Sequence, residues 1–230
     1  MDKLTLIVGN KAYSSWSMRP WLALRACEVN FEEIVVPLYV EGYKEALLAH
    51  SPAGKVPVLK HGERVIWDSL AICEYLAEQF QKARLWPEDP AARSLARAVS
   101  AEMHSGFTAI RSAMPFNCRA TGGHVASSPE LESEIRRVQD LWRGCREQYG
   151  RLGPWLFGRF TVADCMYIPM ALRFVTYGAG ARLEAPGRAY VDTVLQHPVV
   201  QEWIAAARQE PEVIARYEVG KTAAQSPDHP

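Results

Sequence analysis

The chain has 230 residues, of which 48% are hydrophobic and 23% are charged, as is ordinary for a globular protein with a buried core. Its 26 basic and 26 acidic side chains cancel, so no long-range field favours nucleic acid or an anionic membrane surface. The N-terminus lacks a signal-peptide pattern, no apolar run approaches the roughly 18 residues of a membrane span, and the five cysteines show no metal-ligand spacing. We therefore expect a cytoplasmic protein with reduced thiols and no bound metal.

The first third of the chain alternates strand and helix signals. Apolar and β-branched runs predict strands, and helical periodicity predicts the helices between them. Pro20 is expected in the first turn of the first helix, where a missing N–H is tolerated. His61-Gly62-Glu63 is expected to join two strands as a hairpin. In chain order the predicted elements are strand 4–8, helix 17–27, strand 31–38, helix 43–50, strands 56–60 and 64–67, and helix 70–80.

Beyond residue 82 the strand signals stop. Residues 83–90 contain two prolines and suit a linker. Helical spacing of apolar residues returns from Leu95 to Met114, and further helices are expected at 131–149, 162–177, 186–195 and 199–209. The sequence therefore predicts an α/β domain (1–82), a linker (83–90), an all-helical domain (91–217) and a disordered tail (218–230).

A serine-rich segment, Tyr13-Ser14-Ser15-Trp16-Ser17-Met18-Arg19-Pro20, lies between the first strand and the first helix. A hydroxyl at this place would lie near the positive end of the helix dipole. A hydrogen bond from it, together with the dipole, would hold a bound thiol as its thiolate. The alternative is that Ser14, Ser15 or Ser17 only caps the helix.

A Val-Pro pair begins the third predicted strand, in the segment Ser51-Pro52-Ala53-Gly54-Lys55-Val56-Pro57. Proline lacks the N–H that a strand ladder needs. A cis Val56–Pro57 bond would turn the backbone N–H and C=O of Val56 toward a cleft, where they would pair with a peptide ligand. An ordinary edge-strand proline is the alternative.

The pair Asp68-Ser69 lies where a strand ends and a helix begins. In the simpler interpretation Asp68 is an N-cap. In the functional one, the Ser69 hydroxyl and the free N–H groups of the helix bind a carboxylate, and Asp68 accepts a hydrogen bond from an ammonium. The γ-glutamyl end of glutathione carries these two groups on one carbon.

The order of these three motifs resembles the N-terminal domain of soluble glutathione transferases. The Ser-Ser-x-Ser-x-Arg run is similar to the serine-type classes, closest to zeta (maleylacetoacetate isomerase). Over about residues 4–210 the resemblance implies a thioredoxin-like α/β domain followed by an all-helical domain. It further implies that Ser14, with Ser15 beside it, activates the thiol, that Val56 and Pro57 form a backbone clamp, and that Asp68 and Ser69 bind the γ-glutamyl group.

The helical half also resembles the family. Gly158-Arg159-Phe160-Thr161-Val162-Ala163-Asp164 is similar to the capping box of the core helix in its second domain. Thr161 and Asp164 would each accept from the other's backbone N–H, and this role is structural.

Three positions depart from the zeta pattern. Trp16 stands where zeta enzymes carry cysteine, and Lys55 stands where they carry glutamine. Lys55 is expected either to attract the glycine carboxylate of glutathione or to remain a solvated surface lysine. Arg173 has a different spacing from the zeta substrate arginine, so that role is not transferred to it.

The second substrate is expected between the domains. His104, Phe107 and Arg111 are spaced by three and four residues, so one helix face would present them to the cleft, with Trp16 as a pocket wall. The alternative is that they are core or surface residues. Met103, Phe116 and Asn117 belong to the same predicted helix and its exit.

The sequence thus predicts a glutathione transferase in which glutathione, as co-substrate, attacks a small hydrophobic electrophile without a metal. A glutathione-dependent cis-trans isomerase is one alternative, and a non-catalytic binding module is another. The resemblance also implies a homodimer, in which the sheet domain of one subunit packs against the helical domain of the other.

Overall fold

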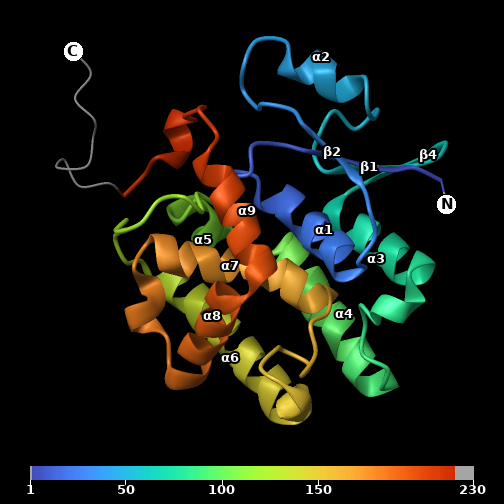
Figure 1. The fold of residues 1–230 in the computed structure, drawn as a ribbon. Coiled ribbons are helices and arrows are strands. Elements are labelled where there is room, and N and C mark those ends of the chain that lie inside the picture. Colours follow the sequence, from blue (N-terminus) through green and yellow to red (C-terminus); the bar gives the residue numbers. More distant parts are fainter. Residues whose placement is uncertain (1, 221–230) are drawn as a thin grey trace, which may run out of the picture.

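The computed structural model describes residues 2–220 and shows a small α/β unit followed by a helical one (Figure 1). Its four strands lie in the order β2-β1-β3-β4. Strand β1 (Leu4–Val8) pairs in parallel with β2 (Glu32–Val35) and antiparallel with β3 (Val58–His61). Strand β3 turns back into β4 (Arg64–Trp67). The predicted combination of a small sheet with a helical domain is therefore confirmed.

The alternation of side chains along β1 explains why helices cover both faces of the sheet. Leu6 and Val8 join the main core with α1 (Ser15–Ala26) and α3 (Ser69–Gln79). Ile7 points to the other face, where it packs in a smaller cluster with Leu47 of α2 (Tyr43–Leu48). The two faces are visible in Figure 1, with α2 apart from α1 and α3.

Several predicted boundaries shift. Helix α1 begins at Ser15, because Ser14 is its N-cap, so Pro20 lies inside the helix and the first-turn prediction is wrong. Strand β3 begins after Pro57, which has no N–H to give to a ladder. In the hairpin His61 pairs with Arg64, which leaves Gly62 and Glu63 as the turn.

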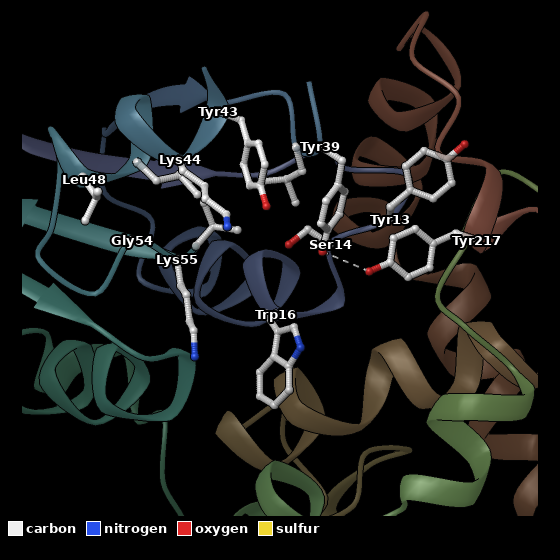
Figure 2. Close-up of a pocket in the computed structure, with 13 residues that line it drawn as sticks. Tyr13, Ser14, Trp16, Tyr39, Tyr43, Lys44, Leu48, Gly54, Lys55 and Tyr217 are labelled. Atoms are coloured by element: carbon white, nitrogen blue, oxygen red, sulfur yellow. Dashed lines mark hydrogen bonds between the residues drawn. The ribbon is translucent and has the colours of Figure 1, made fainter. Parts of the chain in front are cut away.

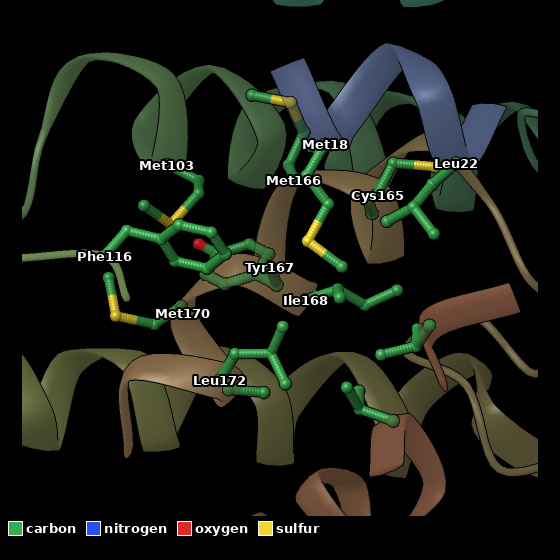
Figure 3. Close-up of a cluster of buried hydrophobic side chains, with 14 of the residues drawn as sticks. Met18, Leu22, Met103, Phe116, Cys165, Met166, Tyr167, Ile168, Met170 and Leu172 are labelled. Atoms are coloured by element: carbon green, nitrogen blue, oxygen red, sulfur yellow. The ribbon is translucent and has the colours of Figure 1, made fainter. Parts of the chain in front are cut away.

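The helical unit is built around α7 (Val162–Thr176), which is buried along almost its whole length. Figure 3 shows methionines of α7, Met166 and Met170, in one cluster with Met18 of α1. This packing joins the two units and fixes the helix that carries the serine segment. The other helices of this unit are α4 (Pro90–Ser105), α5 (Thr108–Ala113), α6 (Pro129–Tyr149), α8 (Ala185–Gln196) and α9 (Pro198–Arg208).

The predicted capping box of α7 is confirmed. Asp164 is fully buried and accepts from the backbone N–H of Thr161 at 2.9 Å and from that of Leu156 at 3.1 Å. The hydroxyls of Thr161 and Tyr190 also donate to it. Asp164 therefore ties the start of α7 to α8 and to the preceding loop.

The predicted continuous helix through residue 111 is wrong. Helix α4 ends at Ser105, and Phe107 has a left-handed φ of 62° before α5 begins. Arg111 folds back and donates to the carbonyls of Met103 and Gly106 at the end of α4. Its guanidinium thus caps the helix terminus.

After α9 the chain returns to the first unit as a C-terminal strap, defined here as residues 210–218, which includes the short 3₁₀ turn Ala215–Tyr217. Glu218, placed by prediction in a disordered tail, instead accepts from the hydroxyl of Tyr13 at 2.5 Å. The tail from residue 221 lies outside the described residues. Within residues 2–220 no helix has both the length and the apolar character to cross a membrane.

Candidate active site

Two adjoining cavities lie along the start of α1. The first has a volume of about 530 Å³ and the second of about 710 Å³, and Trp16, Lys55 and Val56 line both. Ser14 lines the first cavity, whereas the Asp68-Ser69 pair lines the second. The structure therefore brings the three predicted motifs to one continuous cleft.

Ser14 is both a helix cap and a cleft residue. Its Oγ accepts from the backbone N–H of Ser17 at 3.2 Å and lies 2.7 Å from the Ser17 hydroxyl, which itself accepts from the N–H of Gly9. Either hydroxyl of such a pair can donate. When Ser17 donates, the proton of Ser14 is available to a group in the first cavity.

The neighbours of Ser14 are engaged elsewhere. Ser15 is buried, lines neither cavity and accepts from Arg173 Nη2 at 3.3 Å. The Tyr13 hydroxyl donates to Glu218. Burial and this hydrogen bond raise the pKa of Tyr13 to about 12. Of the predicted hydroxyls, Ser14 is the one best placed to meet a ligand.

The Val56–Pro57 peptide bond is cis, which agrees with the functional interpretation of this segment and not with that of an ordinary edge-strand proline. Val56 lies at the junction of the two cavities, and Pro57 lines the second. Figure 2 shows the side chains of Lys44 and Lys55 on the same side of the first cavity. This side of the cleft is cationic and exposed.

The two carboxylate oxygens of Asp68 have different partners. Its Oδ1 accepts from the N–H groups of Leu70 and Ala71, at 2.9 and 3.1 Å, so the predicted N-cap is present. Its Oδ2 lies 3.1 Å from Nε2 of His104, which reaches across from α4. Ser69 is almost completely buried at the floor of the second cavity.

The sequence motif contained Arg19 but gave it no role. Its side chain is 0% exposed, and Nη1 donates to Ser69 Oγ at 3.3 Å, whereas Nε and Nη2 have no hydrogen-bond partner. Burial lowers the pKa of Arg19, and the positive charges of Arg111 and Arg173 lower it further. A buried guanidinium with two unpaired nitrogen atoms therefore lies directly behind the Ser69 hydroxyl.

Trp16, which stands where the resemblance implies a cysteine, lies close to two guanidinium groups and to a histidine. The guanidinium carbons of Arg19 and Arg111 lie 4.3 and 4.9 Å from its ring, and His104 meets it edge-on at 5.3 Å. Trp16 and His104 line the cleft, but Arg111 and Phe107 line neither cavity. Phe107 is instead packed in the core against Tyr167.

Sequence reasoning included Tyr13 in the serine-rich segment but did not predict that several tyrosines meet in the first cavity. They come from three separate segments of the chain, and their roles depend on the fold rather than on a local pattern. Figure 2 shows that Tyr13, Tyr39 and Tyr217 lie together on the side of Ser14 away from the lysines. Tyr43 lines the same cavity.

Comparison with known proteins gives a consistent result. The family model for the N-terminal domain of glutathione S-transferase matches residues 13–79, and the model for the C-terminal domain matches residues 125–206. A probable maleylacetoacetate isomerase of Caenorhabditis elegans is 42% identical over 93 residues, which are 40% of this chain. The chain spans only 42% of that protein's own length. The maleylacetoacetate isomerase of Pseudomonas aeruginosa is 28% identical over 203 residues, 84% of this chain and 91% of that protein.

Solved structures agree in fold. The crystal structure of a glutathione transferase homologue from Burkholderia, with bound glutathione, has a TM-score of 0.67 and 23% identity, and covers 90% of this chain and 98% of that one. The two family models together match well over half of the 230 residues. The chain therefore belongs to the glutathione S-transferase family.

Proposed function

We propose that this chain is a glutathione transferase that holds the thiol of glutathione as a thiolate at Ser14, for attack on a small hydrophobic electrophile. The observation that carries the proposal is that Ser14, Val56 and Ser69 line one cleft. Each offers the donor or backbone group that one part of the tripeptide requires.

The acidic head of glutathione would lie in the second cavity. The Ser69 hydroxyl already accepts from Arg19, so its own proton is left to donate to a carboxylate. Asp68 lines the same cavity and would accept from the ammonium group on the same carbon. The backbone of Val56 would then pair with the cysteinyl residue, and Lys44 and Lys55 would attract the glycine carboxylate.

The chemistry requires a lowered thiol pKa. Free thiols titrate near pKa 8.5, and lowering this by about two units corresponds to roughly 2.7 kcal/mol. A hydrogen bond to a charged group contributes about 1.5–3 kcal/mol and a helix N-terminus about 0.3–1 kcal/mol. The Ser14 hydroxyl at the start of α1 would supply both. Holding both reactants in one cleft would add the advantage of proximity.

A second candidate is a glutathione-dependent cis-trans isomerase, which the names of the nematode and Pseudomonas relatives favour. Trp16 stands where the resemblance implies a cysteine, and its ring lies close to the guanidinium groups of two arginines. For this reason we rank conjugation of glutathione to an electrophile above cis-trans isomerisation as the proposed activity. Turnover of a cis-enedione at a rate equal to or above that of aromatic electrophiles would reverse this order. We further propose that the protein acts in the cytoplasm as a homodimer, as the resemblance implies.

Titration calorimetry with glutathione tests the binding step. We expect uptake below millimolar concentration, and a loss of about tenfold in affinity for Ser69→Ala, because one charge-assisted hydrogen bond is removed. Ser105→Ala is the matched control, since that exposed hydroxyl donates only to the carbonyl of Ala101 in its own helix. No uptake by the unmodified protein at millimolar glutathione would exclude the proposed function.

A further inference from the structure

A buried turn leads from β1 into α1, and we call it the serine turn, residues 10–13. The carbonyl of Asn10 accepts from the backbone N–H groups of Tyr13 and Ser14, at 3.0 and 2.8 Å. Ser14 precedes the regular helix, with φ −95° and ψ 82°. The position of its hydroxyl therefore depends on the serine turn as well as on α1.

The backbone of Lys11 and Ala12 finds its hydrogen-bond partners outside the α/β unit. The two N–H groups donate to the carboxylate of Glu210 in the strap, at 2.5 Å to Oε1 and 2.9 Å to Oε2. The two carbonyls accept from the indole Nε1 of Trp203 in α9, at 3.0 Å, and from the backbone N–H of Cys118, at 3.1 Å. The helical unit and its strap therefore hold the serine turn at these four backbone groups.

Glu210 suits this contact because a carboxylate offers two acceptor oxygens. Successive backbone N–H groups in a turn form a concavity that favours an anion. The strap is fastened around Glu210, since Arg119 donates to the carbonyls of Glu210 and Glu212, both at 2.7 Å. The carboxylate is therefore held against the serine turn before any ligand binds.

Glu210 has no direct route to a ligand in the cleft, because it lines neither cavity. Both sides of its contact also lie outside the matched family ranges, which span residues 13–79 and 125–206. Any effect on the thiol must therefore pass through the serine turn. A displacement of about 1 Å at a reacting group can cost roughly a hundredfold in rate, so such an effect is measurable.

From this geometry we propose that Glu210 is a positioning residue for Ser14, whose carboxylate holds the serine turn so that the serine hydroxyl meets the thiolate of glutathione. The inference rests on the proposed function. The negative charge of Glu210 by itself disfavours a nearby thiolate, so removal of that charge alone would lower the thiol pKa. Loss of the positioning contact raises the thiol pKa, and the sign of the shift separates the two effects.

The test is Glu210→Gln in the full-length protein, with the thiolate absorbance of bound glutathione titrated against pH. Glutamine keeps the side-chain size but replaces one acceptor oxygen with an NH₂ donor, so it cannot accept from both N–H groups. The thiol pKa should rise by about half to one unit, and turnover near pH 6.5 should fall about two- to fivefold with the thiolate fraction. Affinity for glutathione should change by less than about twofold, because the anchors at Ser69 and Val56 remain.

A second measurement shows whether Glu210 acts through the serine. In a Ser14→Ala background, Glu210→Gln should add no further shift of the thiol pKa, because the hydroxyl that it positions is already absent. Additive shifts in the double variant would overturn the inference.

Glu202→Gln is the matched control. Glu202 lies in α9 and also joins the helical unit to α1, through an ion pair with Arg25 at 2.7 Å, but both side chains are exposed and Glu202 lines neither cavity. This variant should leave the thiol pKa unchanged. If Glu210→Gln does not fold, Glu210→Asp repeats the titration, since it keeps both oxygens on a shorter side chain and should shift the pKa less, in the same direction.

Two results would overturn the inference while the glutathione site stands. A lower urea midpoint with an unchanged thiol pKa would show that Glu210 is purely structural. A lowered thiol pKa would show that its charge acts directly on the thiolate. Failure of the unmodified protein to lower the pKa of bound glutathione would overturn the proposed function and this inference together.

Discussion

Asp68 and His104 join the two structural units across the second cavity, with Oδ2 of Asp68 3.1 Å from Nε2 of His104. Burial lowers the pKa of His104, and the charges of Arg19 and Arg111 lower it further, against the raising effect of Asp68. His104 is therefore neutral at pH 7 and donates its Nε2 proton to the carboxylate. This contact holds Asp68 in place beside Ser69.

The lowered pKa of His104 predicts the direction of a pH effect on stability. At pH values between the lowered pKa in the folded protein and the unfolded value near 6.5, the unfolded chain binds more protons than the folded one. The contribution of His104 to the stability of the fold is therefore complete above pH 6.5 and is lost as the pH falls. His104→Gln cannot titrate, so its urea midpoint should fall less steeply than that of the unmodified protein between pH 7 and pH 5. The residual slope in the variant should come partly from His50 and His197, whose pKa burial also lowers. Parallel curves over this range would contradict the assignment.

The hydroxyl pair of Ser14 and Ser17 predicts a separation of chemistry from binding. Ser14→Ala removes the donor to the thiolate, so the pKa of bound glutathione should rise by about one to two units and turnover near pH 6.5 should fall about tenfold or more. Affinity for glutathione should change by less than about twofold, because the anchors at Ser69 and Val56 remain. Thiolate absorbance against pH measures the shift. Ser17→Ala should shift the titration in the same direction by a smaller amount.

Ser14 also caps α1, so its loss should cost stability as well as activity. We expect about 1 kcal/mol from urea unfolding. Ser128→Ala is the matched control, because Ser128 caps α6 by accepting from the N–H of Leu131 at 3.2 Å and lies in neither cavity. It should lower stability by a similar amount and leave the thiol titration unchanged. An unchanged titration in Ser14→Ala would exclude Ser14 as the thiolate donor.

Local signals in the sequence predicted much of the fold. Strand β1, the hairpin before α3 and the caps at Asp68 and Thr161 depend on neighbouring residues, and the structure has them where the pattern placed them. The helix break at Phe107 was missed because the apolar spacing continues across it. The structure explains the break through Arg111, because its side chain folds back and donates hydrogen bonds to the carbonyls at the end of α4.

The rest of the site depends on contacts between distant segments. Arg19 lies in a quoted motif, but its importance comes from Ser69, which is fifty positions along the chain. The strap has no periodic pattern, and its glutamates act through the backbone of the loop at Lys11 and Ala12. Contacts between segments so far apart leave no local spacing pattern from which a single sequence could predict them.

Arg19 provides a prediction that separates ligand binding from stability. Arg19→Met keeps most of the side-chain volume under Trp16 but removes the charge behind Ser69, so affinity for glutathione should fall about tenfold. Because the buried guanidinium faces no carboxylate at hydrogen-bond distance, the free energy of unfolding should stay the same or increase. Calorimetry and urea unfolding of the same preparation measure the two effects.

The control for Arg19 is Arg97→Met. The Arg97 guanidinium also lies over a tryptophan ring, 5.4 Å from the centroid of Trp86, but it is exposed and pairs with Glu74. This variant should bind glutathione as the unmodified protein does. Equal affinity in Arg19→Met and Arg97→Met would show that the charge of Arg19 does not act on the ligand.

Asp164 predicts where the helical unit is most sensitive to a single change. Asp164→Ala would leave the buried N–H groups of Leu156 and Thr161 and the hydroxyl of Tyr190 without their acceptor. Each unsatisfied buried group costs about 1–3 kcal/mol, so the free energy of unfolding should fall by about 3–5 kcal/mol, as measured in urea. Asp140→Ala is the control, because its exposed ion pair with Arg143 should contribute little. Similar losses of stability in both variants would mean that the buried hydrogen bonds of Asp164 do not hold α7 to α8. Other contacts would then have to fix the position of α7 against α1.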